Sequence, residues 1–221
     1  MAEDKEQVVQ KSVELVPGVG SSYKNGWRQM WKYFLELFLI GIIAFAISLP
    51  SLASRVDGGA AAVILGIFSF AYGILVVGPV GYGVAFAYLK AARGDQLKVK
   101  DMFGAFRNYW NAVLACLLVD VIIFVGLVLL IVPGIIFACK LVFTPYLVVD
   151  RKMDVIEAVK ESWRMTNGHA WKAFFIGLLA ILVSIAGLIC FGVGIIVAIM
   201  WISLAFASLY YAVSLSGEAS A

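Results

Sequence analysis

Charged residues are scarce in this sequence of 221 residues: Asp, Glu, Lys and Arg together make up 14% of it, whereas hydrophobic residues make up 63%. An average soluble domain is about one quarter charged and about half apolar. A water-soluble fold could not bury so much apolar surface, which excludes an ordinary soluble enzyme domain. The formal net charge of only +3 provides no basic domain for nucleic acid, so we expect no nucleic-acid partner.

Residues that carry metal and redox chemistry are equally few, with three cysteines and one histidine in the whole chain. Cys116, Cys139 and Cys190 fall inside apolar blocks and form no CxxC motif, so we expect neither a disulfide framework nor a zinc site. His169 stands at the edge of an apolar block, two residues before a tryptophan. The chain has no P-loop, no HExxH motif and no GxSxG motif. We therefore expect no catalytic residue, metal or cofactor, and predict that the protein is not an enzyme.

Long apolar blocks fill most of the chain instead. A helix needs about 20 mostly apolar residues to span a bilayer, and the sequence contains six candidate blocks. They cover residues 31–49, 60–89, 110–131, 134–149, 171–190 and 192–213. The second block predicts a kink at Gly78-Pro79, because proline lacks an amide donor and clashes with the preceding turn. The fourth block contains Pro145 and is short for a span.

Basic residues flank these blocks on one side. They are Lys5, Lys11, Lys24, Arg28 and Lys32 before the first block, Lys90, Arg93, Lys98, Lys100 and Arg107 between the second and third, and Arg151, Lys152, Lys160, Arg164 and Lys172 between the fourth and fifth. Only Arg55 falls on the opposite side. The positive-inside rule then places both termini in the cytoplasm.

The blocks and the charges together predict an all-α polytopic membrane protein. We expect six transmembrane helices, arranged as three hairpins in one compact bundle, with amphipathic helices on the cytoplasmic side. The nearly chargeless segment 132–134 is the expected turn between the third and fourth spans. The six-span domain covers residues 22–214, between cytoplasmic tails 1–21 and 215–221.

A short amphipathic segment precedes each of the first, third and fifth spans, and we call these the lead-in segments. In each one an aromatic-arginine step is followed by a tryptophan at the start of the span. The predicted interfacial residues are Lys24, Trp27, Arg28, Trp31, Lys32, Phe106, Arg107, Trp110, Trp163, Arg164, Trp171 and Lys172. Such residues can anchor a helix among lipid headgroups or dock a cytoplasmic or membrane protein partner. The threefold pattern fits either duplication or independent recurrence of aromatic and basic flanks.

The third lead-in segment has the clearest helical pattern. Asp154 and Glu157 have the spacing of a capping box, although the usual cap is Ser or Thr. Ile156, Val159 and Trp163 form an apolar stripe that we expect to face lipid headgroups or the helix bundle. Glutamates and basic residues three apart can pair along its polar side.

Two charged residues lie deep within predicted spans. Asp120 and Lys140 stand on the two arms of the expected third-to-fourth hairpin, where an unpaired charge would cost several kcal/mol. Counting about 1.5 Å per residue from the turn, the lysine side chain can largely bridge the gap to the carboxylate. We therefore predict an intramembrane ion pair. Such a pair would either lock the hairpin or couple a proton or ion to transport.

Residues 132–171 carry a resemblance to a known group of proteins. They include Pro133-Gly134-Ile135-Ile136, Lys140, Phe143-Thr144-Pro145-Tyr146, Ile156-Glu157-Ala158, Ser162-Trp163-Arg164 and Gly168. The stretch resembles a broad group of bacterial six-span membrane proteins, similar to the membrane region attached to some glycerophosphodiester phosphodiesterases. The resemblance implies the fold and a bacterial cytoplasmic (inner) membrane. It implies no activity, because the acidic and histidine residues of the phosphodiesterase catalytic domain have no counterpart in this chain.

These features favour a non-enzymatic membrane protein, either an accessory subunit of the envelope or a modulator of membrane lipid organisation. Its expected partners are membrane lipids, with a cytoplasmic or membrane protein as the alternative. The second functional hypothesis is a small transporter or channel that uses Asp120 and Lys140.

Overall fold

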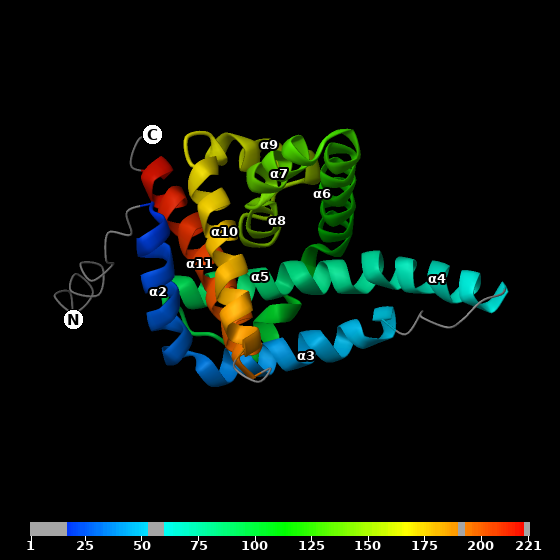
Figure 1. The fold of residues 1–221 in the computed structure, drawn as a ribbon, viewed down its shortest axis with the longest axis horizontal. Helices are drawn as coiled ribbons and strands as arrows, with labels where there is room; N and C mark the ends of the chain where they lie inside the picture. The colour runs from blue at the N-terminus through cyan, green and yellow to red at the C-terminus, as the bar shows by residue number, and fades with distance from the viewer. Residues whose placement is uncertain (1–16, 53–59, 190–192, 219–221) are drawn as a thin grey trace.

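A computed structural model describes residues 17–52, 60–189 and 193–218 (Figure 1). These residues form helices and contain no strand. Six helical segments among them are long and apolar enough to cross a membrane: Phe34–Ser51, Ala62–Arg93, Val99–Leu129, Ile131–Asp150, Ala170–Ile189 and Gly194–Ser216. The predicted all-α fold with six spans is therefore confirmed. Arg55, Cys190 and most of the expected tail 1–21 lie outside the described residues.

The third and fourth spans form a close hairpin of α6 (Tyr109–Leu129) and α7 (Ile131–Leu141). The turn lies at Leu130, which is extended with φ −164° and ψ 143°. It therefore comes before the expected segment 132–134, because proline is well tolerated in the first turn of a helix, where the amides have no helical partner. A Cβ atom on Gly126 would lie 3.0 Å from the Cα atom of Gly134. Glycine at both positions thus allows the two backbones to touch.

The last hairpin consists of α10 (Ala170–Ile189) and α11 (Val193–Glu218). Helix α2 (Val19–Lys32) packs along α11 and also contacts α10 (Figure 1). The Tyr23 hydroxyl donates to the Ile176 carbonyl oxygen at 3.0 Å, and the Trp201 indole donates to the Tyr23 carbonyl oxygen at 2.9 Å. The first lead-in segment is therefore fastened to the third hairpin.

The first hairpin departs from the expected compact bundle. Helices α3 (Phe34–Leu52) and α4 (Ala60–Tyr72) extend to the right in Figure 1, crosswise to α6 and α10. Val63, Ile67 and Phe70 on α4 are exposed. A Cβ atom on Gly66 of α4 would meet nothing within 4 Å, so this small residue is not used for close helix packing, and the Tyr72 hydroxyl joins α4 to α3 by donating to the Ile47 carbonyl oxygen at 2.9 Å.

The second span continues without interruption through Gly78-Pro79, where the sequence predicted a kink, and its irregular turn lies just before that pair. A π-helical turn, η1 (Gly73–Val77), joins α4 to α5 (Gly78–Arg93), directly before Pro79. In an α-helix the Leu75 carbonyl oxygen would accept from the amide that Pro79 lacks. The Tyr109 hydroxyl donates to this oxygen at 2.7 Å, so α6 satisfies the carbonyl that the proline leaves free.

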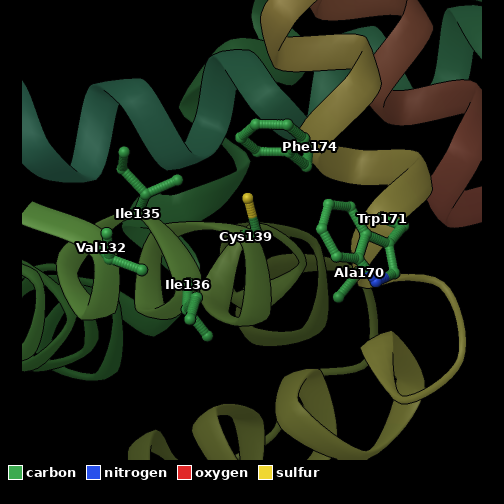
Figure 2. A pocket seen from close by; sticks show the side chains of 7 residues that line it. All are labelled: Val132, Ile135, Ile136, Cys139, Ala170, Trp171 and Phe174. Carbon is green, nitrogen blue, oxygen red and sulfur yellow. The ribbon is translucent and has the colours of Figure 1, made fainter.

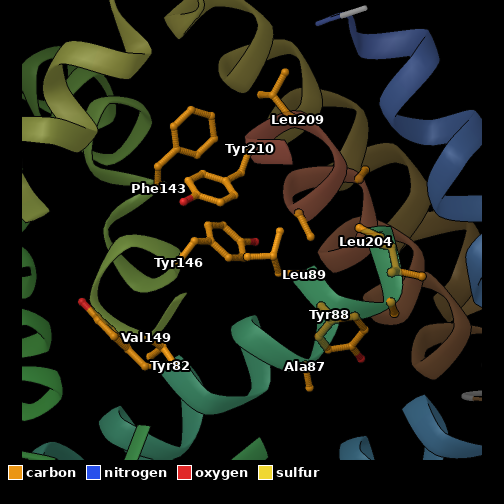
Figure 3. Close-up of a cluster of buried hydrophobic side chains, with 14 of the residues drawn as sticks. Tyr82, Ala87, Tyr88, Leu89, Phe143, Tyr146, Val149, Leu204, Leu209 and Tyr210 are labelled. Carbon is orange, nitrogen blue, oxygen red and sulfur yellow. The ribbon is translucent and has the colours of Figure 1, made fainter. Parts of the chain in front are cut away.

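Proline also divides the fourth span into α7 and α8 (Thr144–Asp150). The break at residues 142–143 precedes Pro145, and it brings Phe143 and Tyr146 into the main core beside α11 (Figure 3). The Tyr146 and Tyr210 rings stack with centroids 4.9 Å apart, and Phe143 meets Tyr210 edge-on at 5.4 Å. The core thus lies where α5, α8 and α11 meet.

Candidate functional site

The second and third lead-in segments form η2 (Val99–Asn108), a 3-10 helix, and α9 (Val155–Thr166). Each of the lead-in helices α2, η2 and α9 comes directly before a span, in agreement with the predicted layout. On α2 the side packed against α11 consists largely of small or polar residues, including Ser22, Asn25 and Gly26. A Cβ atom on Gly26 would lie 3.3 Å from Leu204 and Ala205. Small residues therefore let α2 approach α11 closely, while Tyr23 and Met30 are also buried and Trp31 is exposed.

Helix α9 divides its residues in the same way. Ala158, Ser162 and Thr166 are buried against the protein, whereas Ile156 and Trp163 are exposed. The stripe is therefore divided: Ile156 faces outward, Val159 is half-buried, and the Trp163 ring is partly exposed but lies 5.9 Å from the Phe137 ring of α7. Asp154 is the N-cap residue of α9, but its carboxylate accepts from the Asn111 side chain at 3.0 Å and does not cap the helix.

The predicted interfacial residues share an outward position. Those that are exposed are Lys24, Trp27, Arg28, Trp31, Lys32, Phe106, Arg107, Trp110, Trp163, Arg164 and Trp171, and Lys172 is half-buried. The three tryptophans that open the spans are the most informative. Trp31, Trp110 and Trp171 are 58%, 68% and 72% exposed. Tryptophan is enriched at membrane–water boundaries because its ring is apolar and its N–H is polar.

One surface ion pair on α9 follows the predicted spacing. The Arg164 guanidinium contacts the Glu161 carboxylate at 2.7 Å. Its hydrogen bond lowers the pKa of Glu161 below the ordinary value. Burial, together with the nearby Lys172, lowers the pKa of His169. Glu161 lies on α9 and His169 directly before α10, so both effects belong to the segment between the fourth and fifth spans.

Lys140 and Asp120 do not form the predicted ion pair. The Lys140 ammonium donates to the side-chain oxygen of Asn167 and lies 5.3 Å from the centre of the Trp163 ring. The Asp120 carboxylate accepts from the Cys116 thiol at 3.6 Å. The prediction failed because it did not consider which side of α7 carries Lys140. Lys140 lies three residues after Phe137, and both side chains meet Trp163, so the lysine is on the side of α7 that faces α9.

The break before Pro145 also brings together two segments of the resemblance described above, Phe143-Thr144-Pro145-Tyr146 and Ser162-Trp163-Arg164. At the end of α7 the Lys140 carbonyl oxygen loses its place in a continuous helix, and the Ser162 hydroxyl donates to it at 2.8 Å. The Thr166 hydroxyl lies 3.2 Å from the same oxygen, and the Phe143 amide donates to Ser162 Oγ at 3.3 Å. The Thr166 hydroxyl has one hydrogen and lies nearer the Ser162 carbonyl oxygen, at 2.7 Å. The Ser162 hydroxyl is therefore the group of α9 that satisfies the backbone polar groups that the Phe143-Thr144-Pro145 segment frees.

Sequence reasoning missed a second polar contact at the core. Arg93 of α5 donates to both carboxylate oxygens of Asp150 at 2.7 and 2.6 Å. Its guanidinium also lies 5.7 Å from the Tyr211 ring. The sequence did contain one indication of this contact. Arg93 and Asp150 each stand at the end of an apolar block, and both ends lie on the predicted cytoplasmic side. This bidentate pair fastens α5 to α8.

A polar cleft of about 570 Å³ opens between η2 and the α8–α9 loop. Arg107, Lys152, Asp150 and Asp154 contribute charged groups to its wall. Lys152 has a left-handed backbone with φ 54°, which is uncommon for a residue other than glycine. The cleft therefore combines cations of two segments at the predicted cytoplasmic surface.

Within the described ranges no group of His, Cys, Asp and Glu is close enough together to hold a metal ion. Comparisons with family models, with curated proteins and with solved structures gave no match. The features that the described residues offer as a candidate site are exposed tryptophans, cations beside them and apolar spans.

Proposed function

We propose that this chain is a non-enzymatic integral membrane protein that organises lipids at the membrane surface, as an envelope accessory subunit or a modulator of lipid organisation. The observation that carries the proposal is the exposure of Trp31, Trp110 and Trp171 at the starts of three spans. Each is accompanied by a cation on its lead-in helix. The proposed ligands are anionic phospholipid headgroups.

Electrostatics supports this preference for anionic lipids. Each Lys or Arg near an anionic surface contributes about 1 kcal/mol to membrane binding. Arg28, Arg107 and Arg164 represent the three lead-in helices, and all three are exposed. Several such cations on separate helices would gather anionic lipids around the protein. On α9 the buried residues Ala158, Ser162 and Thr166 are small, and Arg164 is exposed on another side of the helix.

The proposed setting is a bacterial cytoplasmic (inner) membrane with both termini in the cytoplasm, as the basic residues and the resemblance indicate. Single cysteines at Gly58 and Ser216, in a background without native cysteines, should react with an impermeant reagent from opposite sides of the membrane. Reaction of both from the same side would refute the six-span topology.

The lipid proposal is tested by extracting the protein with its surrounding membrane into polymer-bounded discs. The ratio of anionic to neutral phospholipid in the discs is then compared with the ratio in the bulk membrane. We expect enrichment around the native protein and a return toward the bulk ratio in the Arg28→Gln, Arg107→Gln, Arg164→Gln triple variant.

A matched control neutralises three exposed cations that belong to no aromatic-arginine step, namely Lys98, Lys100 and Lys160. If anionic lipids depend on total charge alone, the control triple variant loses as much enrichment as the first. Equal losses, or no enrichment around the native protein, would refute the proposal. The transport alternative depended on an Asp120–Lys140 pair, and the described residues place the two side chains with separate partners.

A further inference from the structure

The polar cleft between η2 and the α8–α9 loop carries charged groups on its wall, unlike the hollow between α7 and α10. That hollow, of about 460 Å³, is lined by apolar side chains such as Ile135, Cys139 and Phe174 (Figure 2). The polar cleft has a volume of about 570 Å³, and Arg107 and Lys152 both line it. Its own wall can therefore select a ligand by charge.

Both carboxylates that line the polar cleft already have a partner. Asp150 accepts from the Arg93 guanidinium at 2.7 and 2.6 Å, and this bidentate contact neutralises its charge. Asp154 accepts from the Asn111 side chain at 3.0 Å and keeps its negative charge. The two cations on the wall outnumber this one uncompensated carboxylate, so the cleft is positive.

The two cations of the polar cleft are not engaged in this way. Among the residues that the structure describes, neither Arg107 nor Lys152 has a hydrogen bond, an ion pair or a ring contact. A guanidinium has five N–H donors and an ammonium has three. The cleft therefore presents unused charged donors from two separate segments.

Lys152 occupies a backbone position that usually favours glycine. Its φ is 54°, at the end of α8, where the Met153 amide donates to the Leu147 carbonyl oxygen at 3.4 Å. Helices often end with a glycine in this left-handed conformation, because glycine has no Cβ atom to clash. The lysine side chain is thus placed at the cleft in spite of backbone strain, and such strain often marks functional residues.

The segments that carry the two cations are fastened to the same helix, α5. The Lys90 ammonium contacts the Asp101 carboxylate of η2 at 2.9 Å. The Arg93 guanidinium contacts Asp150, the last residue of α8, at 2.6 Å. The two sides of the cleft are therefore held in place by the fold, and a preformed site loses less entropy when a ligand binds.

We propose that the polar cleft binds a phosphomonoester group between Arg107 and Lys152. Such a group carries about −1.5 to −2 charges at pH 7, which two cations match better than they match the single charge of a phosphodiester. The guanidinium can bind two phosphate oxygens at once, while the ammonium acts as a point charge. The headgroup of phosphatidic acid and soluble phosphomonoesters share this chemistry. The inference goes beyond the proposed function, because Lys152 belongs to no lead-in helix.

Isothermal titration of the detergent-purified full chain with inorganic phosphate tests this inference. The native protein should bind one phosphate, and Arg107→Gln and Lys152→Gly should each weaken binding about tenfold or more, the effect of losing one charge-assisted contact. Lys152→Gly also removes backbone strain, so its Tm should equal or exceed the native value. The control is Lys100→Gln, which removes an exposed cation of η2 that does not line the cleft and should leave phosphate binding unchanged.

A second arm of the experiment identifies the source of the phosphate group. The titration is repeated in phosphatidylcholine discs that contain either phosphatidic acid or an equal charge of phosphatidylglycerol, a phosphodiester. Weaker phosphate binding beside phosphatidic acid assigns the cleft to a lipid headgroup, whereas equal binding assigns it to a soluble phosphomonoester.

Two results would overturn the inference. One is the absence of saturable phosphate binding by the native protein, and the other is native affinity in a folded Lys152→Gly variant. Either result could accompany loss of anionic lipid enrichment in the Arg28, Arg107 and Arg164 triple variant, which retains Lys152. This inference can therefore fail while the proposed function stands.

Discussion

The Arg93–Asp150 contact gives the sharpest stability prediction. Its two hydrogen bonds measure 2.7 and 2.6 Å, and the side chains are 25% and 15% exposed. Exposed ion pairs contribute about 0.2 to 1 kcal/mol, whereas breaking a buried pair costs about 3 to 5 kcal/mol. For this intermediate burial we expect Arg93→Met or Asp150→Leu alone to lower the free energy of unfolding by about 2 to 3 kcal/mol.

The double variant should recover much of that loss, because neither charge is then left without a partner. For a chain of this length about 1 kcal/mol corresponds to a shift in Tm of roughly 2 to 4 °C. Each single replacement should therefore lower Tm by about 4 to 12 °C. The assay is thermal unfolding in detergent of the native protein, both single variants and the double variant.

Asp120 and Lys140 provide the matched control for this cycle. Because each has its own partner, the effects of Asp120→Asn and Lys140→Met should add to within about 0.5 kcal/mol. Additive losses at Arg93 and Asp150 would refute the assigned contact. Strong rescue between Asp120 and Lys140 would instead restore the direct pair that the sequence predicted.

Three further predictions concern packing, pH and the helix break. A Cβ atom on Gly83 would lie 1.7 Å from the Met102 carbonyl oxygen, whereas one on Gly81 would meet nothing within 4 Å. Gly83→Ala should therefore cost at least about 1 to 3 kcal/mol, and Tm of Gly81→Ala should remain near that of the native protein. Burial lowers the pKa of His169 in the folded protein. The stability that this shift contributes is therefore present above the unfolded pKa of about 6.5. It is lost as pH falls through the lowered pKa of the folded protein. His169→Asn should remove that part of the pH dependence of Tm, and an unchanged profile would contradict it. Ser162→Ala should lower the free energy of unfolding by about 1 to 3 kcal/mol, because the Lys140 carbonyl oxygen loses its hydroxyl donor at 2.8 Å. An unchanged denaturation curve would mean that the hydroxyl is not needed there.

The sequence by itself determined the spans and the character of the lead-in helices. Both depend on local pattern: about 20 apolar residues are needed to cross a bilayer, and tryptophan with arginine marks a boundary wherever a helix enters lipid. The positions of Trp31, Trp110 and Trp171 at the starts of spans follow from these rules. So does the irregular turn before Pro79, because a missing amide is a property of the residue itself.

Only the tertiary structure decided which polar groups meet and how the hairpins are directed. Arg93 and Asp150 are 57 positions apart in the chain, and Asn25 donates to Ser208 across 183 positions. No local pattern encodes such a register. Lys140 bonds to Asn167, and not to Asp120, because it lies on the side of α7 that packs against Trp163 of α9. The direction of the α3–α4 hairpin, which runs crosswise to α6 (Figure 1), likewise follows from no local pattern.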